Sequence, residues 1–140
     1  MSRLEKTCEK VFIRYKDLLY IIKKKPLQVI QKLQSLDISD VAISSITLSE
    51  LEYGVSKSAA VENNKLALIQ FLAPIETIDF DDKSAEVYGG IRAHLEKRGT
   101  PIGPLDTLIG AHALSLGYTL VTNNTKEFER IPDIELENWI

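Results

Sequence analysis

The sequence predicts a single α/β domain whose sheet is mainly parallel. Helical and strand patterns alternate along its 140 residues, as they do when helices connect parallel strands. Hydrophobic residues make up 44% of the chain and charged residues 26%, which is the balance of a soluble globular protein. We find no internal repeat, low-complexity tract or linker that would divide the chain further.

Composition excludes several classes of protein. The longest wholly apolar runs have four or five residues, far short of the roughly 20 that a membrane-spanning helix needs. Cys8 is the only cysteine, so an internal disulfide is excluded and a reducing cytoplasm is indicated. Residues 1–17 carry charges throughout and lack the apolar stretch of a secretory signal. We therefore expect a cytoplasmic protein that makes no membrane contact.

The first part of the chain supplies short strand and helix patterns. Residues 11–13 could form a strand and residues 18–22 a helical turn. A helix is expected over residues 26–36, because apolar side chains recur there at helical spacing and Pro26 suits a first turn. Residues 41–44, Val-Ala-Ile-Ser, predict the next short strand.

Two helices and a strand are expected in the middle of the chain. Residues 47–58 place apolar side chains on one side of a helix. Residues 64–72 predict a second helix, which ends at Ala73 because the residue before a proline disfavours the helical conformation. Residues 75–78 predict a short strand.

The last part of the chain has the clearest helical patterns. Helices are expected over residues 81–97 and 104–116, and a glycine ends each of them. The second helix carries an apolar stripe formed by Leu105, Leu108, Ile109, His112 and Leu116. Because His112 belongs to this stripe, we interpret it as a core residue and not as a base. Residues 118–122 predict a buried strand and residues 134–136 an edge strand.

Three acidic residues fall at expected helix starts. Glu50 follows a strand and lies in the first turn of a helix, Asp106 lies in the first turn of another, and Glu127 follows the next strand. The loops at the carboxyl ends of parallel strands gather where ligands bind in open α/β sheets. These three carboxylates could therefore converge. Mg²⁺, which prefers oxygen ligands, would then be the expected bound ion.

Helix capping is the simpler interpretation of each acid. Thr47-x-x-Glu50 has the pattern of a capping box, and Asn124-x-x-Glu127 is closely related to it. Asp106 in a first turn suits the helix dipole. The face of that helix below Asp106 carries small residues, including Gly110, which permits close packing.

Taken together, four segments resemble PIN-domain ribonucleases of the VapC toxin type. Residues 43–54 (ISSITLSELEYG) resemble the family's second acidic motif, and residues 102–113 (IGPLDTLIGAHA) its third. Residues 120–132 (LVTNNTKEFERIP) resemble the last motif, and residues 135–139 (ELENW) the closing strand. The resemblance runs from about residue 20 to the C-terminus, and it is the combination of motifs that is specific.

The resemblance implies a fold and a function. We expect a PIN-like domain over residues 20–140, with residues 1–19 as an atypical N-terminal segment. Such proteins are Mg²⁺-dependent endoribonucleases, for which Mn²⁺ is an alternative ion, and they are the toxins of type II toxin–antitoxin pairs. Those with Thr-Asn-Asn in the last motif, as at residues 122–124 here, resemble the subgroup that cuts the anticodon loop of initiator tRNA. They form homodimers, and the tail of a small antitoxin blocks their acidic cleft.

The resemblance also implies roles for four residues. Asp106 would be a principal metal ligand, and Glu50 would join the metal through a bound water or position the nucleophile. Glu127 would complete the acidic ring. Asn124 would lie where many PIN domains carry a final aspartate.

The chain departs from the family at its first motif. The family opens with a strand ending in Leu-Asp-Thr-Asn, whose aspartate is a principal metal ligand, and counting back from residues 20–23 places Arg14 there. A guanidinium has no acceptor atom and cannot bind a metal ion. Asp17 lies three residues later, nearly a helical turn away. Two alternatives follow: a catalytically inactive PIN-like protein that retains antitoxin or RNA binding, or an unrelated α/β domain whose acids are helix caps.

A degenerate or frame-shifted N-terminus would explain this departure. Residues 11–15, Val-Phe-Ile-Arg-Tyr, can be encoded by GTA-TTT-ATT-AGA-TAC. Read one base later, with an A from the next codon, the same string encodes Tyr-Leu-Leu-Asp-Thr, which resembles the family's first strand. The gene sequence tests this hypothesis, since codons that yield no Leu-Asp-Thr in the adjacent frame contradict it.

Overall fold

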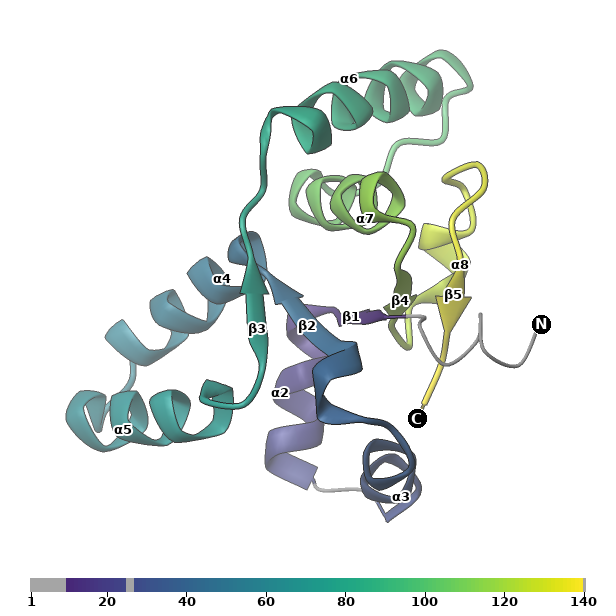
Figure 1. Cartoon of the computed structure of the whole chain (residues 1–140). Coiled ribbons are helices and arrows are strands. Elements are labelled where there is room, and N and C mark those ends of the chain that lie inside the picture. Colours follow the sequence, from purple (N-terminus) through teal and green to yellow (C-terminus); the bar gives the residue numbers. More distant parts are fainter. Residues whose placement is uncertain (1–9, 25–26, 140) are drawn as a thin grey trace.

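Five short parallel strands form a sheet at the centre of the molecule (Figure 1). The computed structural model describes residues 10–24 and 27–139. In chain order, the strands are β1 (Val11–Ile13), β2 (Val41–Ser44), β3 (Glu76–Ile78), β4 (Thr119–Val121) and β5 (Leu136–Glu137). Their order across the sheet is β3-β2-β1-β4-β5, and every pairing is parallel. The prediction of an α/β fold with a mainly parallel sheet is confirmed.

Helices cover both faces of this sheet. They are α2 (Tyr15–Lys24), α3 (Leu27–Ser35), the 3₁₀ turn η1 (Ile38–Asp40), α4 (Ser45–Ser56), α5 (Val61–Leu72), α6 (Asp82–Lys97), α7 (Pro104–Leu116) and α8 (Thr125–Phe128). Figure 1 shows α6 and α7 side by side on one face, with α2 and α3 on the other. In the described part of the chain, no helix is both long and apolar enough to cross a membrane.

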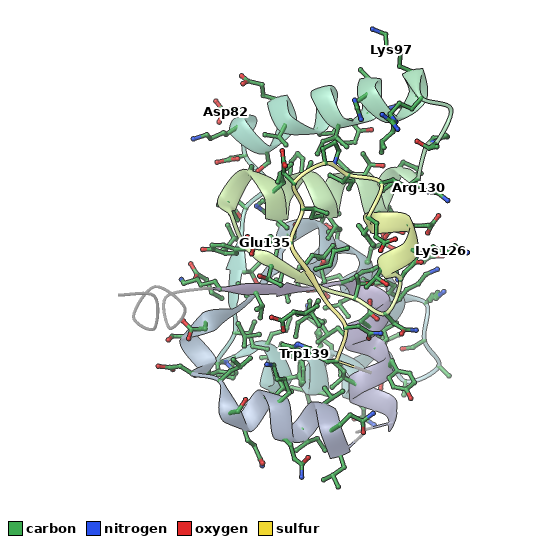
Figure 2. The ribbon with its side chains drawn as sticks, turned by 90° about the vertical axis from the view of Figure 1, so that its right-hand side faces the viewer. Asp82, Lys97, Lys126, Arg130, Glu135 and Trp139 are labelled. Carbon is green, nitrogen blue, oxygen red and sulfur yellow. The ribbon has the colours of Figure 1, made fainter. Side chains whose placement is uncertain are left out.

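Alternation along the strands creates two hydrophobic cores. Val11 and Ile13 of β1 point to the core shared with α2, α3, α4 and α5, whereas Phe12 between them points to the core shared with α6 and α7. Trp139, after β5, joins the first core, and Figure 2 shows it on the α2 side of the sheet. Strands that are buried on both faces are typical of a parallel sheet covered by helices.

β1 is the central strand and belongs to the segment expected to be atypical. It pairs with β2 on one side and with β4 on the other. The division of the chain at residue 20 stays a prediction, although residues 11–13 form β1 and residues 15–19 belong to α2. Residues 1–9, which include Cys8, lie outside the described residues, as does Pro26, the expected first-turn residue of the following helix.

Most expected elements are present, and their differences from the structure have simple causes. α4 begins at Ser45, before residue 47, because the Ser44 side chain accepts a hydrogen bond from the backbone N–H of Ile46 and caps the helix. Glu50 is therefore outside the first turn. The turns η1 and α8 were not expected, since three or four residues are too few to show a helical period.

The apolar stripe expected on α7 is partly wrong. Leu105 and Leu116 are exposed, whereas the small residues between them are buried. α7 packs between α6 and the sheet, and its close approach needs small side chains. At Gly110, a Cβ atom would lie 2.5 Å from Cδ1 of Ile131. The expectation that small residues on this face permit close packing is confirmed at Gly110.

Candidate active site at the carboxyl edge of the sheet

The candidate site lies where β1 and β4 end side by side. The chain leaves β1 through α2 toward β2, while β4 pairs with the opposite edge of β1. Such a reversal of strand order opens a crevice at the carboxyl ends of the two strands. Arg14 directly follows β1, and its backbone N–H donates to the Val121 carbonyl at 3.1 Å. The segment of residues 122–124 directly follows β4.

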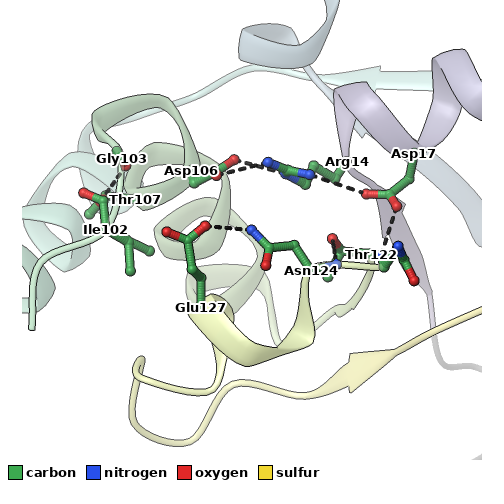
Figure 3. A network of polar contacts seen from close by, with 10 residues as sticks. Arg14, Asp17, Ile102, Gly103, Asp106, Thr107, Thr122, Asn124 and Glu127 are labelled. Carbon is green, nitrogen blue, oxygen red and sulfur yellow. Dashed lines mark hydrogen bonds and ion pairs between the residues drawn. The ribbon is translucent and has the colours of Figure 1, made fainter.

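Arg14 and Asp106 form a two-pronged ion pair in this crevice (Figure 3). Nε of Arg14 donates to Oδ1 of Asp106 at 2.9 Å, and Nη2 donates to Oδ2 at 2.9 Å. Arg14 is 9% exposed, and the side chain of Asp106 is 19% exposed. Asp106 stands in the first turn of α7, where its charge is stabilised by the helix dipole.

Asp17 is the second carboxylate beside Arg14. It lies in the first turn of α2 and is 4% exposed. Its Oδ2 atom is 3.7 Å from Nη1 of Arg14 and has no hydrogen-bond partner, while Oδ1 accepts from the Asn123 backbone N–H at 2.7 Å. The guanidinium of Arg14 therefore lies between a carboxylate of α7 and a carboxylate of α2 (Figure 3).

Asn124 and Glu127 form a further polar pair on the β4 side. Asn124 donates from Nδ2 to Oε2 of Glu127, and its backbone N–H donates to Oγ1 of Thr122 at 2.9 Å. Asn124 is the N-cap residue of α8, but its side chain makes no capping hydrogen bond. The related capping pattern expected here is therefore replaced by a contact between the two side chains.

The surroundings of Arg14 favour its charge. Burial is the largest single influence and opposes the charged form, but the hydrogen bonds and negative charge of Asp106, together with the charges of Asp17 and Glu127, outweigh it. The net result raises the pKa of Arg14 above its ordinary value. Phe128 also presents its ring to the guanidinium, 5.6 Å from Cζ to the ring centroid. Arg14 is a fixed positive charge at this edge of the sheet.

A cavity of about 260 Å³ opens beside the ion pair. Arg14 and Asp106 line it together with Lys16 and, from α4, Glu50. Tyr15 also lines it, and burial together with the negative charge of Glu50 raises the pKa of Tyr15. The expectation that Thr47 and Glu50 form a capping box is wrong, because Ser44 is the capping residue and Thr47 lies inside the helix.

His112 is a core residue, as expected. It is 0% exposed, its Nδ1 lies 2.8 Å from Oγ of Ser44, and Phe12 and Phe80 pack edge-on against its ring. Burial lowers its pKa, although the nearby Asp81 and Asp79 act in the opposite direction. The folded protein therefore favours neutral His112.

Stability is expected to fall as the pH drops below about 6.5, the ordinary histidine pKa. In that range the unfolded chain binds a proton that folded His112 resists, so one such group contributes a slope of at most about 1.4 kcal/mol per pH unit. Urea unfolding between pH 7.5 and 5 measures the free energy of unfolding. His112→Gln should flatten this slope, and a variant slope equal to that of the original chain would contradict the assignment.

Comparisons with known proteins identify the family. The PIN domain model matches residues 18–134. The chain belongs to the PIN-domain family. The match begins after β1, so Arg14 lies outside the matched residues of this PIN domain.

The PIN domain is similar to VapC proteins over most of its length. It is 46% identical over 121 residues to the tRNA(fMet)-specific endonuclease VapC of Salmonella typhimurium, covering 86% of this chain and 91% of that protein. It is 49% identical over 121 residues to Ribonuclease VapC2 of Rickettsia felis, covering 86% and 90%. The prediction of a VapC-type PIN domain is confirmed.

Solved structures of toxin–antitoxin complexes share the fold. The chain superposes on VapBC of Salmonella typhimurium in its DNA-bound form with a TM-score of 0.89 and 42% identity, covering 94% of this chain and 99% of the other. Against VapBC2 of Rickettsia felis bound to a promoter DNA fragment, the TM-score is 0.87 and the identity 44%, covering 93% and 98%.

The structure brings some of the expected site residues together. Glu50 and Asp106 line one cavity, and Asn124 contacts Glu127 near Arg14. PIN-domain ribonucleases generally use divalent metal ions. Within residues 10–24 and 27–139, however, no three His, Cys, Asp or Glu side chains are placed to hold a metal ion. With both Asp106 oxygens bonded to Arg14, the residues in this arrangement do not fit the ion.

Asp17 is the site residue to which sequence analysis assigned no role. Its sequence position, three residues after Arg14, placed it nearly a helical turn away from the family's aspartate. Because α2 begins at Tyr15, that same spacing brings Asp17 back to the Arg14 side chain. Recognising the helix start would have revealed this contact.

Proposed function

We propose that this chain is the toxin of a type II toxin–antitoxin pair and that its activity is endoribonucleolytic. The observation that carries the proposal is the placement of Asp106 and Glu50, from two different helices, in one cavity at the carboxyl edge of a PIN-domain sheet. Relatives named tRNA(fMet)-specific endonuclease and ribonuclease support a tRNA substrate. The anticodon loop of initiator tRNA is the expected position of the cut.

Mg²⁺, with Mn²⁺ as an alternative, is the ion we propose for the family's chemistry in this chain. Asp106 is the carboxylate that would ligate the ion, and Glu50 the one that would join it through water or position the nucleophile. Glu127 would complete the acidic ring, and Asn124, which donates to it, would lie where many PIN domains carry a final aspartate. The role of Asp106 requires Arg14 to leave it, because that carboxylate has no free oxygen while the pair is closed.

The Arg14–Asp106 pair favours a second candidate function. A guanidinium in the position of the family's first aspartate removes one ligand and neutralises another. The chain would then be an inactive PIN-like protein that still binds an antitoxin or RNA. Both candidates share one fold, so measured cleavage separates them.

The partner we propose is a small antitoxin encoded with this chain, and the toxin itself is proposed to be a homodimer in the cytoplasm. The solved structures that this chain resembles carry VapBC names, which supports an antitoxin partner. Co-expression of the two chains with a tag on the antitoxin, followed by affinity purification, tests this. Failure of the chain to co-purify with the antitoxin would contradict the proposed toxin–antitoxin pair and leave RNA binding as the only role of the inactive candidate.

The deciding experiment is cleavage of initiator tRNA with added Mg²⁺ or Mn²⁺. It compares the chain as it stands with Asp106→Asn, Arg14→Asp and the control Asp82→Asn. Asp82 is a suitable control because it is also an acid in the first turn of a helix, α6, but its side chain is exposed. The active toxin requires metal-dependent cleavage that Asp106→Asn abolishes and Asp82→Asn retains.

The same experiment identifies the second candidate. If only Arg14→Asp cuts the tRNA while the original chain binds antitoxin, the chain is an inactive toxin. If Asp106→Asn and Asp82→Asn cut as well as the original chain, Asp106 is a helix-start acid without a catalytic role.

A further inference from the structure

The guanidinium of Arg14 bridges carboxylates that come from two different helices. It bonds both oxygens of Asp106 on α7 and lies 3.7 Å from Oδ2 of Asp17 on α2. Figure 3 shows the side chain extended between the two acids. A positive charge between two carboxylates is the arrangement that a divalent cation would otherwise create.

Several contacts hold Arg14 in this position. Its backbone N–H donates to Val121 of the neighbouring strand, and its carbonyl accepts from the Leu18 backbone N–H at 2.9 Å. Phe128 lies against the guanidinium, and the residue is 9% exposed. The planar fork of arginine matches a carboxylate with two parallel bonds, so the side chain needs little further ordering to form the pair.

A divalent cation needs the same oxygens. Mg²⁺ binds oxygen at about 2.0–2.1 Å, and such an ion would stand next to a guanidinium of like charge. Both oxygens of Asp106 accept hydrogen bonds from Arg14, and Oδ1 of Asp17 accepts from Asn123. The arginine and the ion therefore exclude each other at Asp106.

We infer that Arg14 is a built-in competitor of divalent cations at Asp106. The ion binds there only when the Arg14–Asp106 pair opens, so its apparent affinity is reduced by the fraction of molecules in which the pair is open. This inference rests on the contacts of Arg14 and goes beyond the proposed function, because it requires neither RNA nor antitoxin.

Mn²⁺ binding to the purified full chain tests this, with free Mn²⁺ measured by its electron paramagnetic resonance signal. The variants are Arg14→Met, which removes the competing charge and adds no ligand, and Arg14→Met/Asp106→Asn, which also removes the ligand. Arg92→Met is the matched control, since Arg92 forms an exposed ion pair with Glu96. Circular dichroism establishes that each variant is folded.

Arg14→Met is expected to bind Mn²⁺ about 100-fold more tightly than the original chain. This factor corresponds to an Arg14–Asp106 pair that is open in about 1% of the original molecules. The double variant should lose this gain, and Arg92→Met should bind like the original chain. The inference is overturned if folded Arg14→Met binds Mn²⁺ no more tightly than the original chain. It is overturned equally if the gain survives Asp106→Asn.

Thermal unfolding gives a second, independent measurement. An ion that binds only the folded state raises the midpoint temperature. Mn²⁺ should raise the midpoint of Arg14→Met above its value in EDTA and leave the original chain unchanged at the same concentration. An equal rise in both chains contradicts the competition. Neither assay contains RNA, so a failed cleavage assay and a failed binding assay lead to different conclusions.

Discussion

Replacing Asp106 with alanine is expected to lower the free energy of unfolding by about 3–5 kcal/mol, the range observed when one partner of a buried ion pair is removed. Arg14 would remain charged in a position that is 9% exposed, with two of its hydrogen bonds lost. Asp17 offers only a 3.7 Å contact in return. Urea unfolding of the original chain and the variant measures the difference.

A double replacement separates two quantities: the cost of leaving Arg14 buried and unpaired, and the net contribution of the ion pair to stability. Arg14→Met/Asp106→Leu removes both charges of the pair and keeps apolar volume, so it should recover part of the loss, as apolar replacements of buried ion pairs often do. The recovery is partial because Asp17 then loses its charged neighbour and keeps only its hydrogen bond from Asn123. Asp82→Ala controls for the loss of an acid from a helix start, which is worth about 0.3–1 kcal/mol. If Asp106→Ala costs no more than Asp82→Ala, the pair behaves as an exposed ion pair.

Much of the fold could be predicted because its signals are local. The bounds of α7 follow from a proline at its start, a glycine at its end and helical spacing between them. The three apolar residues Val41, Ala42 and Ile43 likewise indicate β2, whose four residues are all buried. These signals depend on neighbouring residues, so a single sequence is enough to recognise them.

The contacts of the site are not local. Arg14 and Asp106 are 92 residues apart, and they meet because β1 and β4 pair at the reversal of strand order. Periodicity gives strand positions but not which strands are neighbours. The resemblance to PIN domains placed Arg14 at the position of the family's first metal-binding aspartate. It could not show that Arg14 would form hydrogen bonds to Asp106, the other expected metal ligand.

The position of Arg14 leads to the largest expected effect on activity. Arg14→Asp should raise the rate of initiator tRNA cleavage by at least about 100-fold at a fixed, subsaturating Mn²⁺ concentration. The variant frees both oxygens of Asp106 and adds a carboxylate at the end of β1. Metal ions stabilise phosphoryl transition states by several kcal/mol, and each 1.36 kcal/mol corresponds to tenfold in rate.

Arg14→Met distinguishes the two contributions to this gain. It frees Asp106 without supplying a new ligand, so a rate between those of the original chain and Arg14→Asp assigns part of the effect to the competing charge. Arg14→Asp/Asp106→Asn should return the rate to background, because the carboxylate that Arg14 masks is then absent. If Arg14→Asp binds Mn²⁺ tightly and still cuts no faster than the original chain, metal occupancy does not limit cleavage. Glu50, Asn124 and Glu127 would then be the residues at which to seek the missing function.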